Sequence, residues 1–262
     1  MVITLLSDFG DVYPASMKGV ILGIDPGANI VDITHSIPRH DIRAAALILM
    51  TSARYFPSGT VHIAVVDPGV GTKRRAIAIK AISRDDDGKI HYFIGPDNGL
   101  LIPAAKSIGT FEVYEISNKT LFQKNISCTF HGRDIFAPAG AYISKGSKIE
   151  DAGRCIFDFK ELDFGEGKKM NGSIHGKVIY IDSFGNIITN IMNIPGEPDF
   201  RSGDELWIGE RRLTFGSSYG FCKEGDPLVL IGSHGFLEIA VNMGNAAKMF
   251  GMKQGDEVII ST

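Results

Sequence analysis

In the first part of the chain, continuous apolar runs alternate with segments whose apolar residues recur at helical spacing. Residues 2–6 and 61–66 are continuous aliphatic runs that end at polar turns, which is typical of buried strands. Apolar positions at helical spacing predict helices over residues 17–24 and 42–55, and residues 31–34 between them predict another strand. This alternation predicts an α/β layered domain with a mostly parallel sheet.

The next segments predict a hairpin and a further helix. Residues 76–82 and 90–94 flank an acidic, glycine-containing tip at 84–88, which indicates a β-hairpin. The tip contains DDDG, but a calcium loop needs a longer ligand series, so a solvated turn is the better interpretation. Residues 133–144 predict a helix with Pro138 near its first turns.

The pattern changes after about Gly165. A polar, glycine-rich stretch at 164–173 separates the first part from a series of short strands. We therefore expect an N-terminal α/β domain at 1–165 and a smaller all-β, barrel-like domain at 166–262. The strands expected in the second domain are residues 176–181, 206–208, 212–215, 227–231, 237–241 and 257–260.

The amino-acid composition disfavours several classes of binding partner. The 262 residues are 44% hydrophobic and 22% charged, with a formal net charge of −3, which favours neither a nucleic-acid surface nor a polybasic membrane contact. No run of about 18 apolar residues predicts a membrane span. Cys128, Cys155 and Cys222 form no CxxC pair, so we expect neither a disulfide framework nor structural zinc, and we expect a reducing cytoplasm.

Two carboxylates follow predicted strands. Asp8 comes after the first strand and Asp67 after the strand at 61–66. If these strands are parallel neighbours, both side chains lie at the carboxyl edge of the sheet, where α/β proteins bind ligands. The alternative is that both residues only cap turns, since Asp-Phe-Gly and Asp-Pro-Gly are good turn sequences.

A glycine-rich loop and a lone histidine add further candidates. The loop from Asp67 to Arg74 is neither a Walker loop nor a GxGxxG motif, so it does not predict nucleotide phosphate binding. His131 stands in TFHGRD before a predicted helix and suits proton transfer near neutral pH. Considered alone, Arg74 is expected to be a cation on the protein surface. His131 alone is expected to be a residue at the start of a helix that hydrogen-bonds to the backbone. The histidine spacings match no metal motif, so we expect no metal site.

The second domain has its own candidates. In DSFGN at 182–186, the Phe184 ring can stack on a flat base and the Asn186 amide can both donate and accept hydrogen bonds. A second turn, GSHGFLE at 232–238, leads into a strand. Taken alone, residues of each motif more often form a turn or pack in the hydrophobic core than bind a ligand.

Read in order, these motifs resemble one family across nearly the whole chain, the S-adenosyl-L-methionine (SAM) hydroxide adenosyltransferases, relatives of the SAM-dependent fluorinases and chlorinases. The matching stretches are SDFG at 7–10, MKGVI at 17–21, VVDPGVGT at 65–72 with Arg74, GPDNGLL at 95–101, FHGRDIFAP at 130–138, DSFGN at 182–186 and GSHGFLEIAVNMGNAA at 232–247.

The resemblance implies hydrolysis of SAM to adenosine and L-methionine, without a cofactor because SAM is the substrate. It assigns Asp67, Arg74 and His131 to holding and polarising water beside the C5′ carbon. It further implies a homotrimer in which each site lies between the N-terminal domain of one subunit and the C-terminal domain of its neighbour. The substrate-binding residues it implies are Asp8 at the ribose, Phe130 and Phe184 against the adenosyl group, Asn186 at adenine, and Asp182, Ser233 and Glu238 at the methionine end.

This chain departs from the family pattern in places. Its loop after Asp8 is about two residues shorter than usual, and Arg39 and His40 stand where halogenating relatives have an aromatic residue. Asp67 would repel a halide. The alternatives are a SAM halogenase and a module that binds SAM or adenosine without turnover. A methyltransferase is disfavoured because Ser7 to Gly10 replace the glycine-rich loop expected after its first strand.

Overall fold

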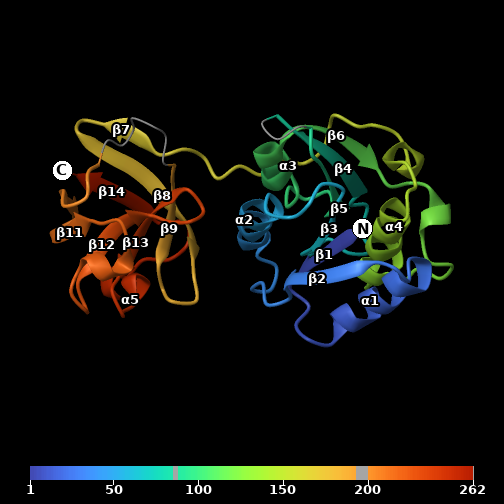
Figure 1. Cartoon of the computed structure of the whole chain (residues 1–262), viewed down its shortest axis with the longest axis horizontal. Helices are drawn as coiled ribbons and strands as arrows, with labels where there is room; N and C mark the ends of the chain where they lie inside the picture. The colour runs from blue at the N-terminus through green and yellow to red at the C-terminus, as the bar shows by residue number, and fades with distance from the viewer. Residues whose placement is uncertain (85–87, 193–199, 262) are drawn as a thin grey trace. The chain divides into compact units, whose positions relative to one another are not determined.

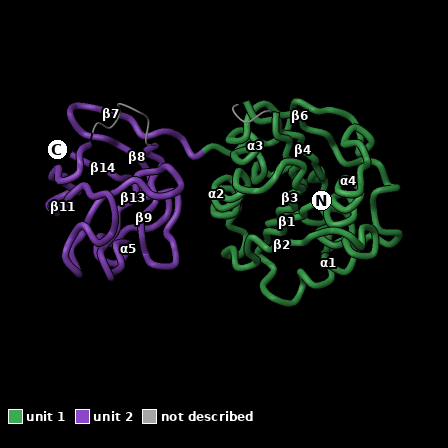
Figure 2. The backbone as a smooth tube through the Cα atoms, in the orientation of Figure 1, with its two compact units in different colours: residues 1–163 green, residues 164–262 purple. Residues whose placement is uncertain are grey.

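The computed structural model describes residues 1–84, 88–192 and 200–261 and divides the chain into two compact units. Unit 1 is Met1–Asp163 and unit 2 is Phe164–Thr262, so the division falls two residues before the expected boundary (Figure 2). Unit 1 is an α/β domain and unit 2 a β-barrel, which confirms the predicted fold class.

Unit 1 is built on a six-stranded sheet of order β2-β1-β3-β5-β4-β6 (Figure 1). The first four strands in that order are parallel neighbours, and β4 is antiparallel to both β5 and β6. The strands are β1 Val2–Ser7, β2 Asn29–Thr34, β3 Val61–Val65, β4 Ala76–Ser83, β5 Ile90–Pro96 and β6 Gly109–Glu115.

Helices cover both faces of this sheet, with α1 and α4 on one side and α2 and α3 on the other (Figure 1). The layers meet in a core whose largest fully buried side chains include Ile3, Ile21, Ile63 and Phe136. The helices are α1 Tyr13–Ile24, α2 Ile42–Ala53, α3 Ile102–Ile108 and α4 Ala137–Ser144, with 3₁₀ turns at η1 Lys119–Leu121 and η3 Ile149–Ala152 and a π turn, η2, at Gly132–Phe136.

Most predicted elements of unit 1 are present with shifted ends. The antiparallel pairing of β4 with β5 confirms the hairpin, although residues 85–87 of its tip, most of DDDG, lie outside the described residues. The helix predicted over 133–144 is η2 followed by α4, with Pro138 in the first turn of α4. Sequence reasoning missed the strand β6 and the helix α3, the latter because two turns of helix are too short to display a helical period.

Unit 2 is a seven-stranded barrel to which β7 adds at one edge. Its strands run in the order β14-β10-β11-β12-β13-β9-β8, and the pairing of β14 with β8 closes the ring. The predicted strands are all found, and β7 and β9 were missed. The elements are β7 Lys168–Met170, β8 Ser173–Ile181, β9 Ile187–Met192, β10 Glu205–Ile208, β11 Arg211–Phe215, η4 Tyr219–Phe221, β12 Pro227–Ile231, β13 Phe236–Val241, α5 Ala246–Phe250 and β14 Glu257–Ser261.

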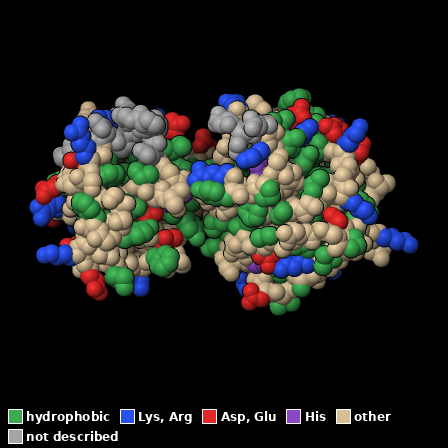
Figure 3. Space-filling view, in the orientation of Figure 1, with side chains coloured by type: hydrophobic (Ala, Val, Ile, Leu, Met, Phe, Trp, Pro, Cys, Tyr) green, Lys and Arg blue, Asp and Glu red, His purple; other side chains and the backbone are tan. Residues whose placement is uncertain are grey.

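The surface carries charges of both signs. On the face shown in Figure 3, basic and acidic side chains are interspersed over each unit. Within the described ranges, every helix is too short or too polar to span a bilayer.

Candidate active site

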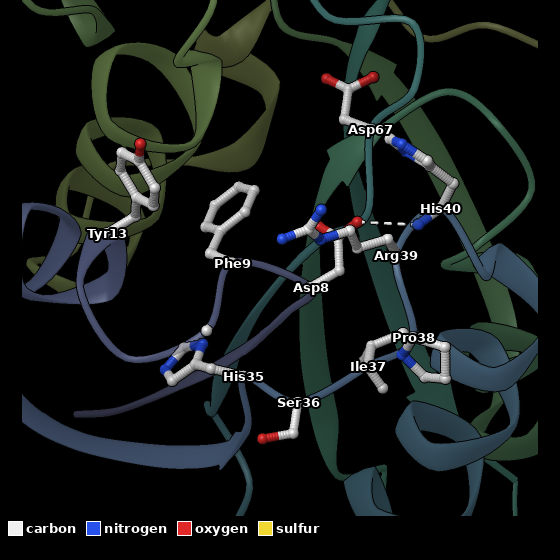
Figure 4. A pocket seen from close by; sticks show the side chains of 11 residues that line it. Asp8, Phe9, Tyr13, His35, Ser36, Ile37, Pro38, Arg39, His40 and Asp67 are labelled. Atoms are coloured by element: carbon white, nitrogen blue, oxygen red, sulfur yellow. Dashed lines mark hydrogen bonds between the residues drawn. The ribbon is translucent and has the colours of Figure 1, made fainter.

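The parallel pairing of β1 with β3 sets the position of two carboxylates. Ser7, the last residue of β1, pairs with Val65, the last residue of β3. Asp8 follows Ser7 directly and Asp67 follows Val65 by two residues, so both lie at the carboxyl edge of the sheet, as the strand pattern predicts. Both line one cavity of about 590 Å³ (Figure 4).

Arg74 joins Asp67 to His131. Its Nε donates to Asp67 Oδ1 at 3.1 Å, and its Nη2 donates to Asp67 Oδ2. The same Nη2 lies 3.0 Å from Nδ1 of His131. The Arg74 and Asp67 side chains are only 7% and 4% exposed. A buried bidentate pair of this kind is held in one geometry. The structure thus brings together the three residues to which the resemblance assigns the chemistry.

The conformation of the loop allows this contact. Gly71 has φ +75°, and a Cβ on it would lie 2.3 Å from the carbonyl oxygen of Cys128. Only glycine accommodates both the left-handed backbone and that close approach. The 67–74 loop can therefore pack against the segment that leads into His131.

The protonation of His131 follows from its neighbours. Burial, and then the positive charge of Arg74, lower the pKa of the imidazole below its usual 6.5, against the smaller opposing effects of Asp67 and Asp134. The ring is therefore neutral at pH 7. Because the Arg74 guanidinium can only donate, Nδ1 of His131 accepts, which assigns the proton to Nε2.

The cavity beside Asp67 is bounded by a strained turn. His40 has φ +66°, which is unusual for a residue with a side chain, and its backbone N–H donates to Asp8 Oδ2 at 3.0 Å (Figure 4). One face of Asp8 is thus fixed by the protein itself. The complete lining is Asp8, Phe9, Gly10, Tyr13, His35, Ser36, Ile37, Pro38, Arg39, His40 and Asp67.

Phe130 belongs to an aromatic group next to this cavity. Its ring centroid lies 5.6 Å from that of Phe9 and 5.6 Å from that of Tyr13, both edge to face. The Arg133 guanidinium also lies over the Phe130 ring, 5.2 Å from the ring centroid. Phe9 and Tyr13 are lining residues that sequence reasoning missed, because aromatic residues near a strand end and in a first helical turn are usually core.

Unit 2 contains a cavity that is also of about 590 Å³, and its lining includes the predicted residues Asp182, Phe184 and Asn186. Asp182 Oδ1 accepts from the backbone N–H groups of Phe184 and Asn186, and Oδ2 accepts from Asn186 Nδ2, each at 2.9 Å. Asp182 therefore holds the turn, while the Phe184 side chain projects and is 75% exposed. The complete lining is Asp182, Phe184, Asn186, Tyr219, Val241, Asn242, Met243 and Gly244.

The remaining two predicted binding residues, Ser233 and Glu238, are not among those that line this cavity. Glu238 is 3% exposed and accepts hydrogen bonds from the Tyr219 hydroxyl at 2.8 Å and from His234 Nε2 at 3.1 Å. Burial and this carboxylate raise the pKa of Tyr219. Glu238 thus supports Tyr219, a cavity residue that no sequence motif indicated. The contacts of Ser233 and Glu238 with the methionine end stay a prediction.

A buried Asp–Arg pair in contact with a neutral histidine, beside a cavity lined in part by aromatic side chains, is typical of an enzyme that acts on a small molecule. Residues 3–153 match the SAM hydroxide adenosyltransferase N-terminal domain, and residues 176–259 match the corresponding C-terminal domain. The chain therefore belongs to the SAM hydroxide adenosyltransferase family.

Individual relatives extend over the whole chain. An "(R)-S-adenosyl-L-methionine hydrolase" from Salinispora tropica is 34% identical, covering 99% of this chain and 97% of its own. A fluorinase from Actinoplanes is 28% identical over 99% and 97% of the two chains, and so is more distant. A crystal structure of an uncharacterised conserved protein from Thermotoga maritima superposes with a TM-score of 0.89 at 36% identity, covering all of both chains.

Proposed function

We propose that this protein hydrolyses SAM to adenosine and L-methionine by attack of water at the C5′ carbon. Membership of the family and the full-length likeness to SAM hydrolases support the reaction. The observation that carries it is the contact of the Arg74 guanidinium with both Asp67 and His131, because it gathers a fixed cation, a carboxylate and a neutral imidazole around one point.

The chemistry requires activation of water rather than of the leaving group. The water oxygen forms a bond to C5′, the C5′–S bond breaks, and its electron pair neutralises the sulfonium, so methionine leaves without needing a proton. Water must lose one proton, and the Asp67 carboxylate is the base that receives it. Proton transfer of this kind typically contributes about 10²–10⁴-fold to the rate.

The other two residues act on the same oxygen. Neutral His131 donates from Nε2 and orients the water, since its Nδ1 accepts from Arg74. The positive charge of the Arg74 guanidinium stabilises the hydroxide character that develops during attack. Both side chains are held before substrate arrives, so little reorganisation is needed during the reaction.

Substrate binding is divided among residues of the two units. Asp8 accepts from the ribose hydroxyls, and Phe130 and Phe184 contact the adenosyl group. Asn186 reads the adenine edge, and Asp182, Ser233 and Glu238 serve the methionine end, Glu238 by holding Tyr219 in place. The exposed Phe184 ring supports this role, because an apolar side chain that is 75% exposed gains most from being covered.

The hydrolase relatives carry (R) in their names, which refers to the configuration at sulfur. We propose the same preference here. Incubation with each sulfonium epimer separately tests it: faster consumption of the (R) epimer supports the preference, and equal or slower consumption contradicts it.

We further propose a homotrimer in which the N-terminal unit of one subunit and the C-terminal unit of its neighbour complete each site. The two sets of predicted residues reside in different units, and Phe184 and Met243 are 75% and 84% exposed beside the unit 2 cavity. Mixed trimers of Asp67→Asn and Asn186→Ala subunits should regain activity, because some sites would then contain neither substitution. Mixtures no more active than their components would contradict shared sites.

A cytoplasmic location is proposed from the cysteines. Cys128 and Cys155 are exposed thiols and Cys222 is half-buried, and all three are free. Exposed free thiols are best preserved in a reducing compartment. Fractionation of cells that express the tagged protein tests the proposal, and secretion would contradict it.

Product analysis tests the function. The wild type should release adenosine and methionine from SAM at a rate independent of chloride, and Asp67→Asn should lose this activity while retaining its fold. Chloride-dependent formation of 5′-chloro-5′-deoxyadenosine would instead support a halogenase, which the carboxylate of Asp67 disfavours. Tight adenosine binding without SAM turnover would indicate a binding module.

A further inference from the structure

The loop that carries Asp67 and Arg74 must cross another strand. It connects β3 to β4, and β5 lies between these two in the sheet. The end of β5 therefore lies below the loop, and the residues that follow it, Asp97 and Asn98, reach both ends of the loop.

Asn98 holds the end next to Asp67. Its Nδ2 donates to the carbonyl oxygen of Val66 at 2.8 Å, and Val66 is fully buried. Its Oδ1 accepts from the backbone N–H of Leu100 at 3.2 Å, which fixes the orientation of the amide. Without this side chain, the Val66 carbonyl would lose this hydrogen bond, and a buried carbonyl without a partner is unfavourable.

Asp97 holds the end next to Arg74. It is 3% exposed, its backbone N–H donates to the Arg75 carbonyl at 3.0 Å, and its Oδ2 accepts from Arg75 Nε at 3.0 Å. Its Oδ1 accepts from the backbone N–H of Lys160 at 2.8 Å. The Arg75 carbonyl also accepts from Arg74 Nη1 at 3.1 Å, so Asp97 and the Arg74 guanidinium share one anchor.

The turn after Asn98 is built to hold this arrangement. Gly99 has φ +95°, and a Cβ there would lie 2.8 Å from the Cβ of Leu162. The chain can therefore turn directly under the loop only with glycine at this position.

From these contacts we infer that Asp97 and Asn98 are positioning residues, which hold the two ends of the 67–74 loop and thereby set the contact of Arg74 with Asp67 and His131. Neither lines the cavity of unit 1. They act through the loop, and the inference rests on the proposed hydrolysis for its kinetic consequences. Misplacement of a catalytic group by about 1 Å can cost about 10²-fold in rate.

The chain supplies a matched control for Asn98. Asn118 makes the same pair of contacts: Nδ2 donates to the Asp151 carbonyl at 2.8 Å, and Oδ1 accepts from the backbone N–H of Thr120 at 3.1 Å. It contacts none of the three catalytic residues. Asn98→Ala and Asn118→Ala therefore remove equivalent local contacts, and only the first should disturb the loop.

We expect Asn98→Ala to lower kcat by about 10–100-fold with KM for SAM unchanged, and Asn118→Ala to leave both unchanged. Asp97→Asn should behave like Asn98→Ala. In an Arg74→Lys background, Asn98→Ala should have a smaller effect than in the wild type, because the contact on which it acts is already broken. Equal kcat in the two alanine variants, or full additivity with Arg74→Lys, would overturn the inference.

A second measurement separates this inference from the hydrolysis itself. The pKa of His131, measured by NMR, should move toward 6.5 in Asn98→Ala as the Arg74 charge moves away, and should stay at the wild-type value in Asn118→Ala. If the wild type releases no adenosine, the proposed function fails and this titration alone decides the inference. An unchanged His131 pKa in Asn98→Ala would overturn it. Should Asn98→Ala fail to fold, Asn98→Asp preserves the Oδ1 acceptor for Leu100 while removing the Nδ2 donor to Val66.

Discussion

Nη2 of Arg74 lies 3.0 Å from Nδ1 of His131, although 57 residues separate the two along the chain. The same guanidinium pairs with Asp67, so one cation contacts both residues proposed to act on water. Burial, and then the positive charge of Arg74, disfavour a second cation on His131, so a neutral imidazole persists beside the Asp67 carboxylate.

Replacement of Arg74 by lysine tests whether the planar guanidinium, which contacts Asp67 and His131 together, is required. Lysine preserves the charge but cannot contact both Asp67 oxygens and His131 in the same way, so kcat should fall by about 10²-fold while the protein stays folded. Arg212→Lys is the matched control, because Arg212 forms an exposed pair with Glu205 at 2.9 Å in unit 2. Steady-state kinetics measures both, and wild-type kcat in Arg74→Lys would refute the role.

The lowered pKa of His131 predicts where kcat/KM decreases on the acid side of the pH profile. Above the lowered pKa the ring is neutral and Nδ1 can accept from Arg74; as pH falls through that pKa, Nδ1 gains a proton and the contact is lost. Values of kcat/KM should therefore be maximal near neutral pH and fall with a midpoint below 6.5. An acid limb centred at or above 6.5 would be inconsistent with the buried, Arg74-bound state.

A buried histidine pair predicts acid sensitivity of unit 1. His62 Nε2 lies 3.1 Å from His91 Nδ1, both side chains are buried, and burial, followed by His91, lowers the pKa of His62 to about 3. The unfolded chain therefore binds more protons below pH 6.5, so the stabilisation is complete above 6.5 and decreases as pH falls toward 3. Between about pH 7 and 5 the loss from His62 is on the order of 2 kcal/mol.

His62→Gln should reduce that pH dependence, whereas His175→Gln, on β8 of the other unit, should leave it unchanged. Urea unfolding followed by helical circular dichroism reports mainly on unit 1, which contains α1 to α4. Equal pH dependence in His62→Gln and the wild type would show that His62 titrates normally.

Phe184 should contribute to binding rather than to the chemical step. Loss of one stacked ring costs about 1–3 kcal/mol, so Phe184→Ala should raise KM for SAM roughly 10-fold or more with little change in kcat. Phe157, which is 89% exposed in unit 1, provides the control Phe157→Ala. If the two variants have the same KM, Phe184 does not contact the substrate.

The sequence predicts the parts of the site that depend on local pattern. The strand runs before Asp8 and Asp67 predict a shared sheet edge, and the register of β1 with β3 places both there. The contact between Arg74 and His131 could not be predicted from spacing, because it depends on Gly71 packing against Cys128. Only the family resemblance indicated it.

The roles of Asp97 and Asn98 were beyond sequence reasoning for a similar reason. GPDNGLL is visible as a motif, but its position under the 67–74 loop follows from β5 lying between β3 and β4. That strand order is a tertiary property. Tyr219, likewise, reaches the unit 2 cavity from a three-residue 3₁₀ turn that has no periodic signal.

Attack of water at C5′ places an oxygen atom from the solvent in the 5′-hydroxyl of adenosine, and isotope labelling detects that atom. The wild-type protein is incubated with SAM in ¹⁸O-enriched water, the products are separated, and their masses are measured by mass spectrometry. The mechanism predicts adenosine that carries ¹⁸O in its 5′-hydroxyl, together with unlabelled methionine. Absence of adenosine, or label in homoserine released together with methylthioadenosine, would contradict it.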